Sequence, residues 1–211
     1  MISAKEALER LQQGNQRFVV NECLRDAAIS HARRAEATLG QAPFAIILGC
    51  SDARVPAELV FDQGIGDLFV IRVAGNIVAP SLIGSVEFAA SQFGTRLVVV
   101  LGHSRCGAIK ATLDELLEPG KTGSLNLRSI VNRVRPSVQG LLRTDLRHNH
   151  DDLIKQAVRS NVAASVNQLR YGSDILEDLI MHDGLTVVGA EYDLDTGRVD
   201  FFEGLDTFPS A

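Results

Sequence analysis

Three short apolar runs, the second interrupted only by Arg72, constrain the fold of this chain more than any other feature. They are Phe44–Leu48, Leu68–Val73 and Leu97–Leu101. Runs of this kind are typical of parallel strands that are buried on both faces of a sheet. A helical segment over Ser81–Phe93, ended by Gly94, separates the second run from the third. Strands that alternate with helices predict an α/β fold with a mainly parallel central β-sheet flanked by helices.

Helical patterns also precede the first run. The segment Ser3–Glu6 has the form of a capping box and predicts that a helix begins there. The Ala- and Arg-rich segment His31–Leu39 predicts a second helix, which ends at Gly40. We therefore expect an N-terminal helical arm over about residues 1–40.

The C-terminal half is expected to add further helices and a hairpin. Apolar residues at helical spacing predict helices at Ile109–Leu117, Ile154–Leu169 and Ser173–Met181. The turn residues Asp193–Gly197 lie between the strand-like segments Thr186–Ala190 and Val199–Phe202, which is a hairpin signal. Lys121–Leu125 is expected to be a flexible loop.

Length and charge limit the function classes. The chain has 211 residues without an internal repeat or a Gly/Ser-rich linker, so we expect a single domain over residues 1–211. Its 26 acidic and 21 basic side chains give a formal charge of -5, which disfavours binding to nucleic acid. No apolar run approaches the roughly 18 residues of a membrane span, and no secretory signal is visible. We expect a cytoplasmic protein without a nucleic-acid or membrane partner.

Two of the three cysteines directly follow predicted strands. Cys50 follows the first apolar run, and His103 and Cys106 follow the third, three residues apart. Because the carboxyl ends of parallel strands open onto one crevice, we expect these side chains to converge. Two thiolates and one imidazole suit Zn²⁺, and three protein ligands leave a fourth position for water, as in a catalytic site. Cys23 lies outside both motifs.

The residues around these ligands resemble the β-class carbonic anhydrase family. The two motifs are Cys50-Ser51-Asp52-Ala53-Arg54 and His103-Ser104-Arg105-Cys106-Gly107, with Phe61–Gly64 and Arg72–Asn76 between them. The resemblance runs from about Gln41 to Lys110 with matching spacing. It implies one Zn²⁺ per chain on Cys50, His103 and Cys106, with a catalytic Asp52–Arg54 pair beside it. It also implies a homodimer or a dimer-of-dimers tetramer, with the active site at the subunit boundary.

The same resemblance implies five substrate-binding positions. Gln41 matches a glutamine that can hydrogen-bond substrate, and Phe69 and Ala74 match residues that line an apolar CO2 pocket. Gly107 matches a glycine whose backbone approaches the site. Phe88 stands where plant-like members carry Tyr, so a hydroxyl contact from that position is absent.

Departures from the family pattern bear on the subgroup. A bicarbonate-inhibited subgroup has Trp three residues before the first cysteine, whereas this chain has Ile47 and contains no Trp. We therefore expect it to be closer to the plant-like subgroup, although Arg72 survives from the same bicarbonate pocket. Most members have Ser at the position of Ala53, a change that we expect to be mild.

The function that these residues predict is the zinc-dependent, reversible hydration of CO2 to bicarbonate and a proton, by attack of zinc-bound hydroxide on CO2. Asp52 can accept a hydrogen bond from the bound water, and Arg54 can keep that carboxylate ionised through a forked contact. Two alternatives stay open. One is hydrolysis of CS2 or COS, which are linear, apolar analogues of CO2, on the same scaffold. The other is a non-catalytic structural zinc protein.

Three other enzyme or binding classes lack their signatures. The segment Gly64–Phe69 lacks the final glycine of a dinucleotide fingerprint, which argues against a zinc dehydrogenase. Gly102–Gly107 lacks the Lys-Ser/Thr ending of a P-loop. A zinc deaminase would need His-x-Glu and Pro-Cys-x-x-Cys, and neither is present. The sequence assigns His148 and His150 no proton-shuttle role.

Overall fold

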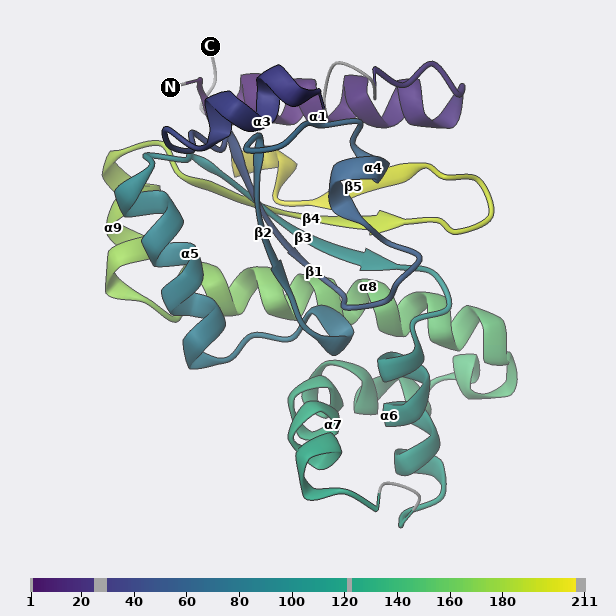
Figure 1. The fold of residues 1–211 in the computed structure, drawn as a ribbon. Coiled ribbons are helices and arrows are strands. Elements are labelled where there is room, and N and C mark those ends of the chain that lie inside the picture. Colours follow the sequence, from purple (N-terminus) through teal and green to yellow (C-terminus); the bar gives the residue numbers. More distant parts are fainter. Residues whose placement is uncertain (1, 25–29, 121–122, 208–211) are drawn as a thin grey trace.

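A computed structural model describes residues 2–24, 30–120 and 123–207 of the chain. Within these residues the core is a five-stranded sheet of order β2-β1-β3-β4-β5 (Figure 1). The strands are β1 (Ala45–Gly49), β2 (Leu68–Arg72), β3 (Leu97–His103), β4 (Thr186–Tyr192) and β5 (Val199–Glu203). The first four are mutually parallel, and β5 pairs antiparallel with β4. The predicted α/β fold class and C-terminal hairpin are confirmed.

Helices cover both faces of this sheet (Figure 1). On one face lie α1 (Ala4–Val19), α3 (His31–Ala37) and the short α4 (Ala57–Val60). The other face carries α5 (Pro80–Gln92), α8 (His150–Tyr171) and α9 (Asp174–His182). Beyond the carboxyl ends of β1 and β3, α6 (Gly107–Leu117) and α7 (Leu125–Val138) pack against α8 as a separate lobe. Short 3₁₀ turns complete the set: η1 (Ala74–Asn76), η2 (Gln139–Arg143), η3 (Asp145–His148) and η4 (Leu205–Thr207).

Burial explains why the strand segments are mostly apolar. Every residue of β1, β3 and β4 is buried. Ile47 and Val99 pack into the apolar core under α1, whereas Ile46 and Val98 pack into the core under α5 and α8. Side chains that alternate between two covered faces are therefore mostly apolar, which produces the runs seen in the sequence, and the buried polar exceptions, His103 on β3 and Thr186 and Glu191 on β4, lie at or near the strand ends.

The N-terminal arm begins as its sequence predicts. Ser3 caps α1 by accepting a hydrogen bond from the Glu6 backbone N–H, and the Glu6 carboxylate accepts one from the Ser3 N–H at 2.8 Å. The second predicted helix, α3, ends at Ala37, and none of its residues is buried. Part of the predicted arm, residues 25–29, lies outside the described residues.

The loop predicted at Lys121–Leu125 can be compared with the structure only at its C-terminal end. Residues 121 and 122 lie outside the described part of the chain, and Leu125 begins α7 rather than ending a loop. The sequence analysis missed this helix, which buries Val131, Val134 and Val138 although Pro136 lies in its last turn. Proline interrupts the helical signal in sequence, because it lacks the N–H that would bond to the carbonyl four residues earlier.

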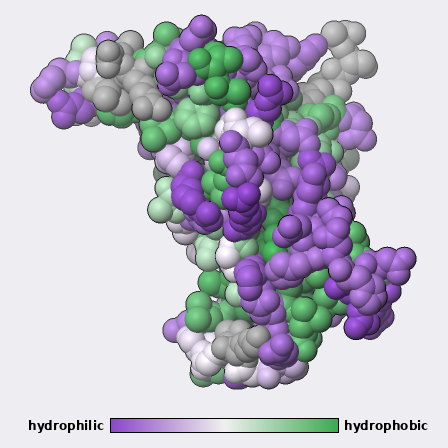
Figure 2. Space-filling model, turned by 90° about the vertical axis from the view of Figure 1, so that its right-hand side faces the viewer, coloured by the Kyte–Doolittle hydropathy of each residue, from purple (hydrophilic) through white to green (hydrophobic). Residues whose placement is uncertain are grey.

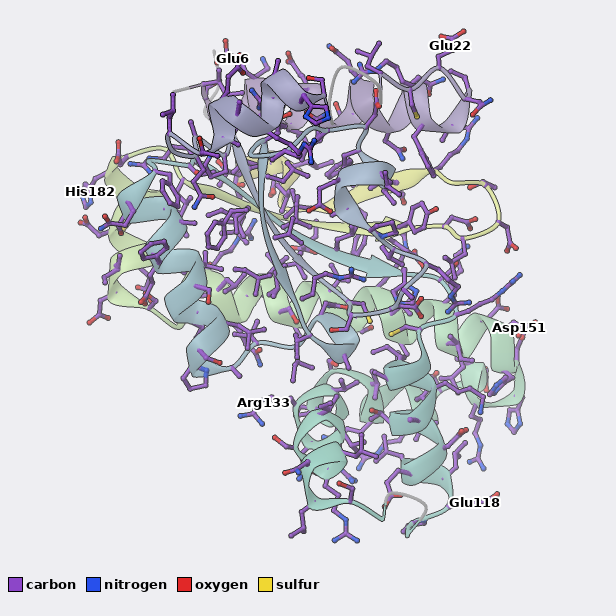
Figure 3. The ribbon with its side chains drawn as sticks, viewed as in Figure 1. Glu6, Glu22, Glu118, Arg133, Asp151 and His182 are labelled. Atoms are coloured by element: carbon purple, nitrogen blue, oxygen red, sulfur yellow. The ribbon has the colours of Figure 1, made fainter. Side chains whose placement is uncertain are left out.

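The side chains that Figure 3 labels lie on α1, α7, α8 and α9 and directly after α1 and α6. They project outward from the layers. Among the described residues, no helix has the length and apolar character needed to cross a membrane.

Candidate metal centre

The three predicted metal ligands converge at the carboxyl ends of β1 and β3. These strands are neighbours in parallel register, with Gly49 opposite Leu101. Cys50 therefore leaves β1 beside the end of β3, where His103 is the last strand residue. Cys106 is the N-cap of α6. The ligand atoms of Cys50, His103 and Cys106 all lie within 4.8 Å of one another, and all three residues are buried.

The imidazole of His103 is oriented for a metal. Its Nδ1 lies 2.9 Å from the Ser104 backbone oxygen, so this nitrogen carries the hydrogen and donates it. Nε2 is then the atom with a free lone pair. Among the described residues, Nε2 of His103 is one of two buried side-chain atoms without a hydrogen-bond partner. A buried acceptor left unpaired is costly, and a cation between Nε2 and the two sulfur atoms would satisfy it. The residues present therefore fit Zn²⁺.

The two thiols hold a negative charge between them. The pKa of Cys50 is lowered to about 4, chiefly because the Cys106 thiol donates a hydrogen bond to its sulfur. The pKa of Cys106 is raised because it keeps the proton of that hydrogen bond, and burial adds to the effect. A second negative charge in this buried space requires a cation. A divalent metal supplies it and releases the remaining proton.

Asp52 and Arg54 form a closed pair beside the ligands. Arg54 donates to Asp52 three times: from Nε to Oδ1 at 2.9 Å, from Nη2 to Oδ2 at 2.7 Å and from its backbone N to Oδ1 at 3.0 Å. These bonds lower the pKa of Asp52 well below its usual range, with the Arg54 side chain as the largest cause. Oδ2 of Asp52 is 3.8 Å from Nε2 of His103. The carboxylate is thus ionised, held by Arg54, and close to the ligand set.

Two further residues hold the first ligand loop, and sequence reasoning gave neither a role there. Gly75 donates its N–H to Sγ of Cys50 at 3.4 Å. It adopts φ 72°, and a Cβ there would lie 3.1 Å from Cβ of Ala108, so glycine allows this close approach. Arg72 donates from Nε to the Cys50 carbonyl at 3.0 Å and from Nη2 to the Asp52 carbonyl at 2.6 Å. Both residues lie in the quoted segment Arg72–Asn76, which was the available signal.

Comparisons with known proteins agree with this geometry. The family model described as carbonic anhydrase matches residues 45–199. A carbonic anhydrase of Mycolicibacterium smegmatis is 40% identical over 199 residues, which cover 92% of this chain and 91% of the relative. A structure described as a tetrameric β-carbonic anhydrase of Sordaria macrospora superposes with a TM-score of 0.72 at 25% identity, covering 80% of this chain and 85% of the other. The chain belongs to the β-carbonic anhydrase family. Carbonic anhydrase 2 of Mycobacterium tuberculosis is 38% identical over 193 residues, with 91% and 89% covered.

The substrate-binding positions expected of a β-carbonic anhydrase divide into two groups. Ala74 and Gly107 are adjacent in sequence to Gly75 and Cys106 and so lie at the metal centre. The other three do not lie there in a single chain. Gln41 precedes β1, so the whole strand, about 15 Å long, separates it from Cys50. Phe69 lies three residues before the end of β2 and packs against α5.

Phe88 lies on α5, away from the metal centre, in a small aromatic group. Its ring centroid is 6.2 Å from that of Phe69 and 5.6 Å from that of Phe93. The Phe88 side chain is 52% exposed, an unusual fraction for an aromatic residue in such a group. Cys23 is partly buried and is not a member of the ligand cluster.

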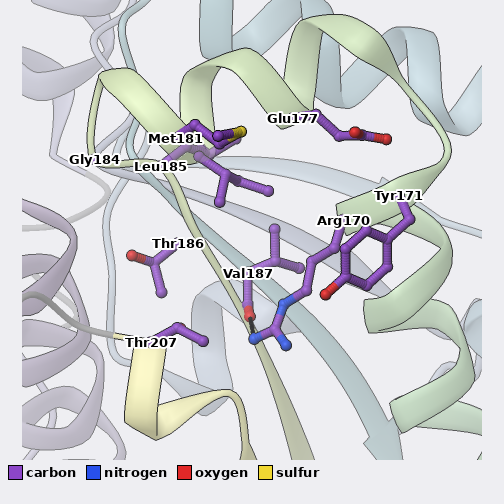
Figure 4. Close-up of a pocket in the computed structure, with 10 residues that line it drawn as sticks. Arg170, Tyr171, Glu177, Met181, Gly184, Leu185, Thr186, Val187 and Thr207 are labelled. Atoms are coloured by element: carbon purple, nitrogen blue, oxygen red, sulfur yellow. Dashed lines mark hydrogen bonds between the residues drawn. The ribbon is translucent and has the colours of Figure 1, made fainter.

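A cavity of about 220 Å³ lies at the amino end of β4, between α8, α9 and η4 (Figure 4). Arg170 lines it and donates to the Val187 carbonyl at 2.7 Å. None of the ligands or the Asp52–Arg54 pair lines this cavity. It is therefore not part of the metal centre.

Proposed function

We propose that this β-carbonic anhydrase catalyses the reversible hydration of CO2 to bicarbonate and a proton, with one Zn²⁺ per chain on Cys50, His103 and Cys106. The observation that carries the proposal is the buried, unpaired Nε2 of His103 in one cluster with the sulfur atoms of two buried cysteines. When bound, Zn²⁺ supplies a Lewis acid that lowers the pKa of a coordinated water molecule and makes it a nucleophile at accessible pH.

Asp52 and Arg54 are the catalytic pair in this proposal. Arg54 takes up both oxygens of Asp52 and keeps the carboxylate ionised, which also holds it back from the metal position. An ionised carboxylate is an acceptor only, so Asp52 can orient the hydrogen of a nucleophilic water molecule and leave the oxygen lone pair free for CO2. The backbone N–H of Gly75 donates to Sγ of Cys50 and stabilises its thiolate.

The active site requires a second copy of the chain. Gln41, Phe69 and Phe88 are proposed to bind substrate together with Ala74 and Gly107, but in one chain they are remote from the ligands. Several surfaces are uncovered on or beside the segments that carry them: β2, which carries Phe69, is an edge strand, and in the segment before Gln41 α3 buries no residue and Leu39 is 91% exposed. We propose a homodimer in which each chain supplies these residues to its partner, with a dimer-of-dimers tetramer as the further assembly. The Sordaria macrospora relative is described as tetrameric.

The proposal also covers the subgroup of the family, the domain organisation and the cellular location. Ile47 lies fully buried within β1, and Arg72 is engaged by two backbone carbonyls. Ile47 thus takes the position of the Trp in the bicarbonate-inhibited subgroup, and Arg72 is occupied by backbone groups. Both features support membership closer to the plant-like subgroup. We propose that residues 1–211 form one zinc domain and act in the cytoplasm.

Two measurements on the same purified protein sample test the proposal. Zinc is quantified in the purified protein, and CO2 hydration is followed by stopped flow with a pH indicator. We expect about one zinc per chain and hydration far above the uncatalysed rate. Zinc without hydration of CO2, but with hydrolysis of CS2 or COS, would identify a hydrolase. Zinc with neither activity would identify a structural zinc protein.

A further inference from the structure

The residues between two of the proposed zinc ligands are tied to a distant part of the chain. Ser104 and Arg105 separate His103 from Cys106, and both contact the turn of residues 193–198, which joins β4 to β5. The sequence separation of each contact is 90 residues. The turn projects on the face seen in Figure 2, where hydrophilic side chains gather.

Ser104 is held at two atoms and in turn holds the imidazole of His103. Its backbone N–H donates to the Tyr192 carbonyl at 2.9 Å, which extends the β3–β4 ladder by one bond. Its Oγ accepts from the Leu194 N–H at 3.0 Å. Its carbonyl oxygen accepts from Nδ1 of His103 at 2.9 Å. With the Ser104 peptide fixed in this way, the imidazole has one orientation, and Nε2 points at the thiols.

Arg105 provides a second anchor. Its φ is 56°, in the left-handed region that non-glycine residues seldom adopt, so the tertiary structure has to hold it there. Nη2 of Arg105 pairs with Oδ2 of Asp195 at 2.7 Å. Both side chains are more than half exposed, so this pair is the weaker of the two anchors.

The turn is stiff enough to act as a support. Oδ1 of Asp193 accepts from the backbone N–H groups of Asp195 and Thr196, at 2.9 and 2.8 Å, and from the Thr196 hydroxyl. Gly197 donates back to the Asp193 carbonyl at 2.9 Å. These bonds close the turn on itself, and the Ser104 and Arg105 contacts start from this closed unit.

We propose that the β4–β5 turn braces the metal centre and that Ser104 is its positioning residue, acting through His103. The bond from Leu194 to Oγ of Ser104 fixes the carbonyl that orients the His103 imidazole. Partners of metal-bound histidines typically change metal affinity by about 10- to 100-fold when they are removed. The proposal rests on the zinc site proposed above.

The test measures zinc release from the holoenzyme into excess chelator, with a chromogenic zinc indicator. We expect Ser104→Ala to release zinc several-fold faster than the wild type, because the carbonyl that accepts from Nδ1 of His103 remains but loses the Leu194 bond that fixes it. Ser104→Thr keeps the hydroxyl and should restore slow release. Ser173→Ala is the matched control. Ser173 also accepts a backbone N–H, from Leu176, but at the N-cap of α9, and its loss should leave zinc release unchanged.

A second variant keeps the test decisive if Ser104→Ala does not fold. Asp195→Asn alters only the exposed ion pair, and we expect zinc release about threefold faster. The brace is overturned if folded Ser104→Ala releases zinc at the wild-type rate. If that variant is unfolded, a wild-type rate in Asp195→Asn overturns it. Wild-type protein without stoichiometric zinc would instead refute the proposed function.

Discussion

At the scale of single residues, protonation and pairing decide what the metal centre can do. His103 offers one unpaired nitrogen, Cys50 and Cys106 share a proton, and Asp52 is kept ionised by Arg54. Each of these states follows from a neighbour within hydrogen-bond distance. Single substitutions should therefore separate metal binding from catalysis.

Cys106→Ser should lose tightly bound zinc, because a neutral hydroxyl replaces one of two sulfur ligands. Metal analysis after dialysis against a weak chelator measures this. Cys23→Ser is the control and should keep about one zinc per chain, since Cys23 lies outside the cluster. Full, tight zinc in Cys106→Ser would show that the ligand set is wrong.

Asp52→Asn should leave zinc content and fold intact while kcat/KM for CO2 hydration falls by about 10²-fold. The amide keeps the size of the carboxylate but presents a donor where an acceptor is needed. Stopped-flow assays with zinc analysis of the same samples measure the effect. Glu58→Gln, an exposed neutralisation on α4, is the control and should keep wild-type activity. Near-normal kcat/KM in Asp52→Asn would remove Asp52 from the mechanism.

The Cys50 thiolate should also make the stability of the metal-free protein depend on pH. Its folded pKa of about 4 lies below the roughly 8.5 of a free thiol, so the unfolded chain binds more protons between these values. The free energy of unfolding should therefore rise with pH through this window, and this contribution is lost as pH falls toward 4. Tm of the zinc-free protein at pH 6, 7 and 8 measures the slope. Zinc-free Cys50→Ser should show a smaller change of Tm with pH. Equal changes in the wild type and the variant would contradict the lowered pKa of Cys50.

At the scale of elements, close packing between strands and α8 positions the second ligand. Gly102 precedes His103 on β3, and a Cβ there would lie 2.5 Å from Cγ2 of Val162 on α8. Two polar side chains of α8 also hold η1: Asn161 donates to the Gly75 carbonyl at 2.8 Å, and Ser165 donates to the Asn76 carbonyl at 3.0 Å. Helix α8 thus sets the spacing of both ligand loops.

Gly102→Ala should lower the free energy of unfolding by about 1–3 kcal/mol, because α8 or β3 must shift to admit the methyl group. Chemical denaturation measures the change. Gly84→Ala on α5 is the matched control. A Cβ there meets nothing within 4 Å, and the change should be neutral or stabilising by up to about 1 kcal/mol. If both substitutions changed the free energy of unfolding equally, the packing of α8 on β3 would not be tight at Gly102.

At the scale of the whole molecule, the residues proposed to bind substrate are spread over distant regions of one chain. The ligands lie at the carboxyl ends of β1 and β3, whereas Gln41 lies before β1 and Phe88 is exposed on α5. One chain cannot bring these regions together while the sheet stays intact. Association of two copies can.

Phe88→Arg should shift sedimentation toward the monomer and lower CO2 hydration in parallel, because a charge replaces an apolar contact of the proposed interface. Met181→Arg on α9 is the control. Met181 is 75% exposed but belongs to none of the elements proposed to meet the partner, so assembly and activity should persist. A fully active wild-type monomer at low concentration would refute the shared site.

The sequence by itself determined the sheet, the ligand set and the family motifs, because each is written in local patterns. Buried parallel strands are mostly apolar, and ligands must follow strand ends, so Cys50, His103 and Cys106 could be predicted as neighbours. Only the tertiary structure decided which groups support them. The hydroxyl of Ser104 meets Leu194 from 90 residues away, the Gly75 carbonyl meets Asn161, and α7 stays helical despite Pro136. Such contacts depend on how whole elements pack, and a local pattern does not encode packing over that distance.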